Sequence, residues 1–220
     1  MPDVQRAQES WAVVVPVKRL AGAKTRLGLP AAERARLALA MAEDTIRACA
    51  AADAVRRVVV VTDDPDGAAM ALGTGAVVVP DEPDAGLNPA LRHGAAHAVA
   101  ALGEVGIVTV SSDLPALRAV DLEAVLRAAA PYEQAIVADA AGTGTVLYAA
   151  TRAAGFRPAY GGQSRLAHVH AGAADLTERA SAQLRRDVDT VTDLRAAWDL
   201  GVGAATRRAV EAMGGVDRLG

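Results

Sequence analysis

The chain has 220 residues, of which 52% are hydrophobic and only 3% aromatic, and its formal net charge is -3 at pH 7. This length and apolar content suit a single compact α/β domain with a sizeable core. The slightly acidic balance excludes the strongly basic face of a nucleic-acid groove, and the scarcity of aromatic side chains excludes a surface on which bases stack.

Short β-branched runs alternate with longer helical patterns through the first half of the chain. The expected elements, in chain order, are a strand at 12–16, a helix at 31–52, a strand at 58–62, a helix at 66–73, a strand at 76–80, a helix at 89–102 and a strand at 106–110. This alternation predicts βαβ units and a mostly parallel central sheet flanked by helices. The strand runs are apolar throughout, as is typical when helices cover both faces of a sheet.

The regular alternation stops in the second half of the chain. Asp121 is expected to cap a helix, and strands are expected at 135–139 and just before residue 150. A glycine-rich stretch at 160–165 then suggests an excursion from the sheet that covers a site. A capping box that begins at Thr190 predicts the first of two closing helices.

We expect one domain over residues 11–214, between a disordered N-terminal extension at 1–10 and a flexible tail at 215–220. The polar first residues lack the apolar core of a signal peptide, and the longest apolar runs are far too short to span a bilayer. Cys49 is the only cysteine, which excludes an intramolecular disulfide and favours a reducing compartment. The sequence therefore predicts a cytoplasmic protein with no membrane or nucleic-acid partner, and it leaves the oligomeric state open.

The only two lysines of the chain, Lys18 and Lys24, fall in one loop directly after the first expected strand. The same loop carries Arg19, Arg26 and a glycine, Gly22. Backbone N–H groups and fixed cations that converge in such a turn suit a polyanion such as a nucleoside triphosphate. A solvated basic loop is the alternative interpretation. Neither a Walker P-loop nor a GxGxxG fingerprint is present, so the two common phosphate-binding motifs do not apply.

Polar or proline-bearing loops follow each of the first four expected strands. These loops begin at Lys18, Thr62, Pro80 and Ser111. Because ligands of open α/β sheets bind at the carboxyl edge of the strands, we expect the four loops to line one site.

Asp113 stands at the end of the fourth expected strand and is the first candidate for a metal ligand. Mg²⁺ needs only one or two protein carboxylates when phosphate oxygens and waters complete its shell. Asp187 and Asp189 could supply the second carboxylate, although an Asp-x-Asp pair before a helix is as often a helix cap. We assign the metal site to Asp113 and Asp187.

Other polar residues have plain structural interpretations. Asn88 stands directly before a proline, which is typical of a capped helix start. His93 and His97 would share one helix face, but the absence of a third ligand argues against zinc. His168 and His170 receive no role from the sequence.

The chain from Val13 to about Arg208 resembles a known family, the CofC or FbiD guanylyltransferases of coenzyme F-420 biosynthesis. The motifs that carry the resemblance are Val17-Lys18-Arg19-Leu20, Ala23-Lys24-Thr25-Arg26-Leu27, Leu87-Asn88, Asp113-Leu114-Pro115-Ala116-Leu117, Val137-Ala138-Asp139, Gly142-Thr143-Gly144-Thr145, Gly161, Ser164 and Asp187-Val188-Asp189-Thr190.

The resemblance implies a single-domain Rossmann-like nucleotidyltransferase fold and the transfer of GMP from GTP to a small phosphorylated three-carbon acid. In the branch that this chain most resembles, the acceptor is phosphoenolpyruvate, and the products are enolpyruvoyl-2-diphospho-5'-guanosine and pyrophosphate. In the archaeal branch the acceptor is 2-phospho-L-lactate.

The resemblance and the motifs together give a set of expected site residues. The expected catalytic cations are Lys24, Arg26 and Lys18. Phosphoenolpyruvate is expected to bind Thr145, Gly161 and Ser164, with added charge from Arg165. The nucleotide is expected to bind Gly22 and Asn88, with the loops around Thr62 and Pro80, and Mg²⁺ is expected to bind Asp113 and Asp187.

Two alternatives stay open from the sequence. One keeps the fold and changes the acceptor, as in a nucleotidyltransferase of molybdopterin, sugar-phosphate or erythritol-phosphate metabolism. The other is a nucleotide-sensing protein without catalysis, against which the joint presence of Lys24, Arg26 and Asp113 argues.

Overall fold

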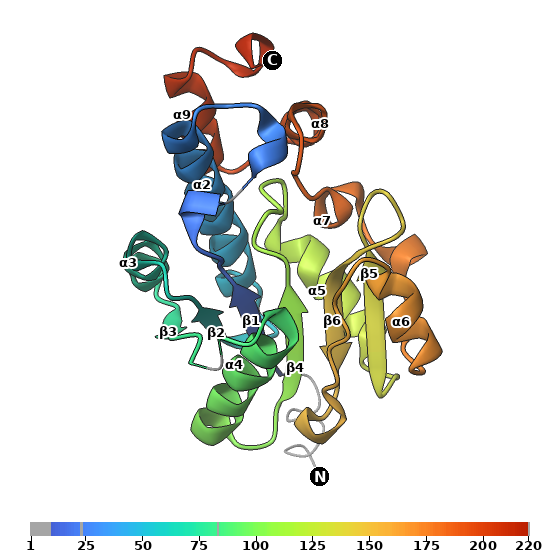
Figure 1. Ribbon diagram of the computed structural model, residues 1–220. Helices are drawn as coiled ribbons and strands as arrows, with labels where there is room; N and C mark the ends of the chain where they lie inside the picture. Colours follow the sequence, from blue (N-terminus) through green and yellow to red (C-terminus); the bar gives the residue numbers. More distant parts are fainter. Residues whose placement is uncertain (1–9, 23, 83, 220) are drawn as a thin grey trace.

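The computed structural model describes residues 10–22, 24–82 and 84–219. Its strands form one seven-stranded sheet in the order β3-β2-β1-β4-β6-β5-β7 (Figure 1). The strands are β1 (Trp11–Pro16), β2 (Val55–Val61), β3 (Val77–Val79), β4 (Gly106–Val110), β5 (Gln134–Ala138), β6 (Thr145–Ala150) and β7 (Ala174–Asp175).

The sheet is mostly parallel, as the sequence predicts. Strand β1 pairs in parallel with β2 and β4, β2 with β3, and β5 with β7. Strand β6 is antiparallel to both of its neighbours, β4 and β5. The first four strands therefore end at one edge, and the start of β6 lies beside the end of β4.

Helices cover both faces of the sheet. The described helices are α2 (Ala31–Ala50), α3 (Pro65–Gly73), α4 (Leu87–Leu102), α5 (Ala119–Ala129), α6 (Ser164–His170), α7 (Ala182–Arg185), α8 (Val191–Leu200) and α9 (Ala204–Ala212). Apolar residues of α2, α3, α5 and α7 pack in one buried cluster with alternate residues of β1, such as Val13 and Val15. Helix α4 packs against the other face with Ala12 and Val14. This alternation explains why the strand runs are apolar throughout.

Gly94 lets α4 approach the sheet closely. A Cβ atom at this position would lie 2.7 Å from Val14 Cγ1 and 2.7 Å from Val61 Cγ2, which is closer than real Cβ contacts allow. The absence of a side chain at Gly94 therefore allows α4 to pack directly against β1 and β2.

Two expected helix caps are not observed. Helix α5 begins at Ala119 with Arg118 as its N-cap, and Asp121 lies inside the first turn, where both of its carboxylate oxygens bind the Arg118 guanidinium. Helix α4 begins at Leu87 after Gly86, and the Asn88 side chain does not cap it. The capping box of Thr190 and Asp193 at the start of α8 is confirmed.

The C-terminal segment differs from the flexible tail that the sequence suggests. Residues Val216–Arg218 form a short 3-10 helix, and Leu219 is buried in an apolar cluster with α2, α8 and α9. The backbone oxygen of Leu219 also accepts a hydrogen bond from Arg195 on α8. The domain thus continues to Leu219. The expected N-terminal extension lies outside the described residues, except for Ser10. Across the described ranges, every helix is too short or too polar to cross a membrane.

Asp44 joins α2 to α9 and is expected to be a large contributor to stability. This buried carboxylate on α2 accepts hydrogen bonds from the backbone N–H groups of Ala205 (3.0 Å) and Thr206 (2.7 Å) at the start of α9. Replacing Asp44 with alanine leaves two buried donors without an acceptor, so we expect the free energy of unfolding to fall by about 2–4 kcal/mol in urea denaturation. The exposed Asp199 supplies the control, since Asp199→Ala should change stability by less than about 0.5 kcal/mol. An equal effect of both substitutions would contradict the assignment.

Candidate active site

The loop after β1 turns sharply at Lys24. Lys24 has φ 54° and ψ 38°, the left-handed conformation that non-glycine residues seldom adopt, and it is followed by a short 3-10 helix, Thr25–Leu27. The backbone N–H of Leu20, earlier in the loop, donates to the Asp64 carboxylate after β2 (2.9 Å). Non-glycine residues in such conformations persist where their surroundings hold them, and they cluster at ligand sites.

The Lys24 ammonium lies between two carboxylates from distant parts of the chain. Its Nζ atom donates to Asp113 Oδ2 after β4 and to Asp189 Oδ1 before α8, the latter at 2.9 Å. Burial lowers the pKa of Lys24, but the two carboxylates outweigh burial and hold that pKa above its ordinary value. Lys24 is therefore a fixed, fully charged cation at the carboxyl edge of the sheet.

Arg26 and Lys18 lie at the rim of the same site. Arg26 donates to the second carboxylate oxygen of Asp189, but its side chain is 70% exposed, against 13% for Lys24. Lys18 is exposed and lines the same cavity as Lys24. The three cations expected from the sequence thus come together, with Lys24 the most firmly held.

Negative charge gathers around Asp187. Burial, followed by the neighbouring carboxylates of Asp113, Asp139 and Asp189, raises the pKa of Asp187 to about 7. The 187–189 segment is tied to the β4 loop because the N–H of Val188 donates to the Asp113 backbone oxygen (3.1 Å). The start of α8 is capped by Thr190 and Asp193 instead, so helix capping does not account for Asp187 or Asp189.

Two adjoining cavities run along this edge. One, of about 500 Å³, is lined by Lys18, Gly22, Lys24, Asp113 and Asp189, among others. The second, of about 270 Å³, is lined mainly by the loops after β2 and β3, and it shares with the first the chain from Pro16 to Arg19 and Leu87. The four strand-end loops thus lie along one edge of the sheet around two adjoining cavities, and their use as a single binding site stays a prediction.

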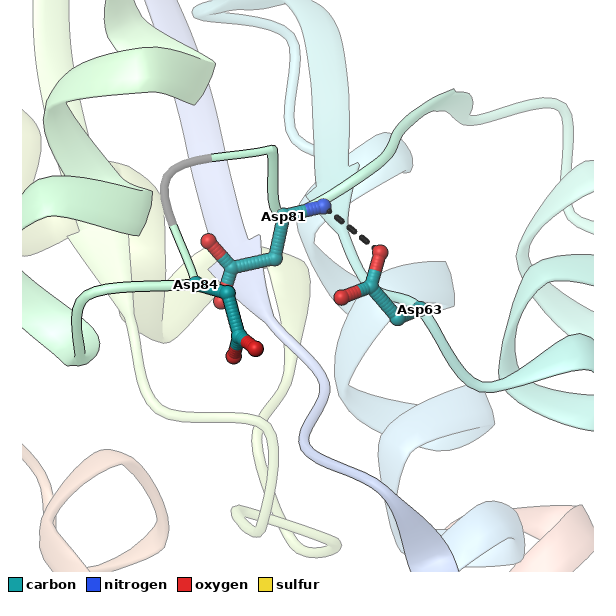
Figure 2. A group of neighbouring side chains, drawn as sticks. All are labelled: Asp63, Asp81 and Asp84. Carbon is teal, nitrogen blue, oxygen red and sulfur yellow. Dashed lines mark hydrogen bonds between the residues drawn. The ribbon is translucent and has the colours of Figure 1, made fainter.

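Three carboxylates that were not predicted as a group lie at the second cavity. Asp63, Asp81 and Asp84 each offer a carboxylate oxygen within 4.8 Å of the others, and Figure 2 shows them drawn together from the β2 and β3 loops. The backbone N–H of Asp81 donates to Asp63 Oδ1 (2.9 Å), and Arg19 lies 3.8 Å from the other oxygen of Asp63. The position of Asp63 and Asp81 just after two neighbouring strands was the signal that could have revealed them.

The expected acceptor residues lie at the start of β6 and before α6. Thr145 begins β6, and the next residue accepts a hydrogen bond from the N–H of Ser111 after β4 (2.9 Å), which places this end of β6 beside the loop of Asp113. The Thr145 hydroxyl lies 3.2 Å from Nδ1 of His168 on α6. Ser164 begins α6 and is buried one helical turn before His168, and Gly161 is exposed in the preceding loop. Thr145 and Ser164 are thus brought together around a histidine that the sequence left unassigned.

The turn before β6 is built around Asp139. Its two carboxylate oxygens accept the N–H groups of Thr143 and Gly144, both at 2.9 Å. A Cβ atom at Gly144 would lie 2.4 Å from that carboxylate, so only glycine fits. Arg165, from which added charge at the acceptor is expected, pairs with Asp175 (2.8 Å), and its side chain also donates to the Gly142 backbone oxygen.

Asn88 makes contacts that the sequence did not suggest. Its Nδ2 donates to the Tyr160 backbone oxygen (2.9 Å), and its Oδ1 accepts from the Tyr160 N–H (2.8 Å). The amide therefore links the start of α4 to the loop before α6. A contact between Asn88 and the nucleotide stays a prediction.

The mostly parallel sheet and its flanking helices give this chain the α/β fold of nucleotidyltransferases. A solved nucleotidyl transferase from Methanothermobacter shares the fold, with a TM-score of 0.59 at 19% identity over 87% of this chain and 97% of that one. The model of the family "Guanylyl transferase CofC like" matches residues 11–210, and the chain belongs to this family.

Two relatives support the same assignment. A phosphoenolpyruvate guanylyltransferase from Thermomonospora curvata is 52% identical over 91% of this chain and 88% of its own length. A protein of the same name from Streptomyces scabiei is 50% identical over 90% of this chain and 95% of its own length.

Proposed function

We propose that this protein is a phosphoenolpyruvate guanylyltransferase, which joins the phosphate of phosphoenolpyruvate to the α-phosphorus of GTP and releases pyrophosphate. The observation that carries the proposal is the Lys24 ammonium, held by Asp113 and Asp189 at the cavity on the carboxyl edge of the sheet. The high identity to proteins named for this activity supports the choice of substrates.

The acceptor needs charge neutralisation more than it needs a general base. The second pKa of a phosphate monoester is about 6, so the attacking oxygen is already largely ionised at neutral pH. Two anions must approach each other, and Lys24, Arg26 and Lys18 supply fixed positive charge where the triphosphate would lie. Lys24 exchanges its carboxylate partners for phosphate oxygens when the nucleotide binds.

The carboxylates of the site fit a divalent cation such as Mg²⁺. Asp113 and Asp187 would hold it, and the raised pKa of Asp187 is what an excess of buried carboxylates without a cation produces. When bound, the cation would neutralise and orient phosphate oxygens.

The second cavity suits the guanine base. Guanine presents N–H donors at N1 and N2, which carboxylates accept, whereas adenine offers an acceptor at N1. Asp63, Asp81 and Asp84 line this cavity, and Leu87 links it to the phosphate cavity. Gly22 lines the phosphate cavity, where its backbone can lie close to phosphate oxygens.

The phosphoenolpyruvate site is assigned to Thr145, Gly161 and Ser164. Hydroxyl and backbone N–H donors are suited to the carboxylate and phosphate of a small acid. Thr145 lies beside the loop of Asp113, which brings the acceptor next to the proposed metal and triphosphate.

The assay that tests the function uses purified protein with GTP, Mg²⁺ and either phosphoenolpyruvate or 2-phospho-L-lactate, and it measures pyrophosphate release and product mass. We expect the guanylylated product of phosphoenolpyruvate, and little product when ATP replaces GTP. A product from 2-phospho-L-lactate alone would overturn the acceptor. GTP binding without turnover of either acid would favour the nucleotide-sensing alternative.

A further inference from the structure

His168 is the centre of a buried polar network between β6 and α6. The residue is 0% exposed. Its ring stacks on Tyr148 at a centroid distance of 4.6 Å and meets the Tyr160 ring edge-on at 5.2 Å. Nε2 accepts the backbone N–H of Ala159 (2.9 Å), and Nδ1 lies 3.2 Å from the Thr145 hydroxyl oxygen. One side chain therefore contacts both segments that carry the proposed acceptor residues.

These contacts fix the tautomer of the ring. A backbone N–H can only donate, so Nε2 carries no proton, and the proton of the neutral ring is on Nδ1. Burial lowers the pKa of His168 to about 4, which keeps the ring neutral at physiological pH. Nδ1–H then faces two acceptors, the Thr145 hydroxyl oxygen and the backbone oxygen of Ser164, whose hydrogen bond to the ring partly opposes the effect of burial on the pKa. A protonated Nδ1 cannot accept, so the Thr145 hydroxyl does not donate to the ring. In the described part of the chain, the Thr145 hydroxyl has no other hydrogen-bond partner, so its own proton is not committed to a protein acceptor.

A β-bulge brings Thr145 to this histidine. On β5, Val137 pairs with Leu147 and the next residue, Ala138, pairs with Thr145, so Val146 is an extra residue of β6. Side chains three apart on a regular strand point to opposite faces, yet Thr145 and Tyr148 both contact His168. Bulges that re-aim a side chain are common next to active sites.

The loop before α6 is held from the same side. Asn88 binds both backbone groups of Tyr160, and the Tyr160 hydroxyl lies 2.5 Å from Thr109 Oγ1 on β4. Ala159, held by His168, stands two residues before Gly161. The backbone that leads to Gly161 and Ser164 is thus anchored at consecutive residues.

We propose that His168 is a positioning residue of the acceptor site, which makes the Thr145 hydroxyl a donor to phosphoenolpyruvate and anchors the backbone before Gly161. This inference rests on the proposed function. The carboxylate or phosphate of the acid accepts a hydrogen bond from the Thr145 hydroxyl, because the protonated Nδ1 of His168 cannot accept one.

The kinetic test replaces His168 with phenylalanine, which keeps a ring on Tyr148 and removes both nitrogen contacts. We expect the KM for phosphoenolpyruvate to rise about tenfold, as loss of one hydrogen bond to a charged group implies, with the KM for GTP unchanged within about twofold. In a Thr145→Val background the same substitution should raise the acceptor KM by only about threefold or less, because the two residues act through one hydrogen bond. His170→Phe, at the exposed histidine of the same helix, is the control and should leave both KM values unchanged.

The outcomes separate this inference from the proposed function. If the unmodified protein makes no product from GTP and phosphoenolpyruvate, the proposed function fails. If it does, fully additive effects of the His168 and Thr145 substitutions, or a parallel rise of the GTP KM, would overturn the positioning role. Should the His168 variant not fold, ¹⁵N NMR of histidine-labelled protein decides the point: we expect a proton on Nδ1 of His168, and a proton on Nε2 would refute the inference.

Discussion

Replacing Lys24 with methionine is expected to lower kcat about 100- to 1000-fold with GTP and phosphoenolpyruvate, the loss typical of removing one fixed group that stabilises developing charge. Methionine keeps most of the side-chain length and removes the ammonium that Asp113 and Asp189 hold. Steady-state kinetics at saturating Mg²⁺ measure the effect.

Arg26 provides the matched control within the same loop. Its side chain is 70% exposed, and among the described residues its guanidinium binds Asp189 alone, so Arg26→Met should lower kcat by about tenfold or less. Equal losses in the two variants would contradict the view that burial between two carboxylates makes Lys24 the principal cation. If Lys24→Met turns over as fast as the unmodified protein, the proposed catalytic role of Lys24 is wrong.

Replacing Asp187 with asparagine is expected to change activity and stability in opposite directions. The substitution removes a proposed metal ligand, so we expect kcat/KM to fall about 100-fold or more, as is typical when a direct metal ligand is lost. In metal-free protein at about pH 8, the same substitution should raise the free energy of unfolding by about 2 kcal/mol, because it removes a carboxylate that burial and three neighbouring carboxylates make costly to ionise.

The pH dependence of this stability has a definite sign. The pKa of Asp187 is about 7 in the folded protein and near 4 in an unfolded chain. Folding therefore favours the protonated form of Asp187. The contribution of this group to the free energy of unfolding is fully present below about pH 4 and is lost as the pH rises through about 7. Asp187→Asn should remove that loss, and Mg²⁺ should raise the melting temperature of the unmodified protein more than that of the variant. Identical profiles for the two metal-free proteins between about pH 5 and 8 would contradict the prediction, and Asp199→Asn at an exposed position is the control.

The sheet and the meeting of Lys24 with Asp113 could be predicted because they follow from features that repeat along the chain. The largely apolar β1 and β4 and the apolar run Val58–Val61 of β2 require helices on both faces, and parallel strands bring their following loops to one edge. That geometry places Lys24 and Asp113 together although they lie far apart in sequence.

The residues that could not be predicted are those whose partners come from distant segments. Asn88 has the local pattern of a helix cap, yet its side-chain amide binds the backbone N–H and C=O groups of Tyr160, which lies 72 positions away in the sequence. From the sequence the metal site is assigned to Asp113 and Asp187 with Asp189 as the alternative, and only the structure shows that Asp189 is the partner of Lys24. His168 stands in a short helix without a motif, and its role emerges from a bulge in β6 that no spacing rule indicates.

The ion pairs of Lys24 also bear on the order in which ligands arrive. The Lys24 ammonium already neutralises Asp113 and Asp189, and its covalent attachment gives it a high effective concentration at these carboxylates. A divalent cation without nucleotide must compete with this ammonium for the same carboxylates. A nucleotide that binds together with its cation would supply phosphate oxygens as new partners for Lys24 and positive charge as a new partner for the carboxylates. We therefore expect Mg²⁺ and GTP to bind as one complex, more tightly than Mg²⁺ alone binds the protein without nucleotide.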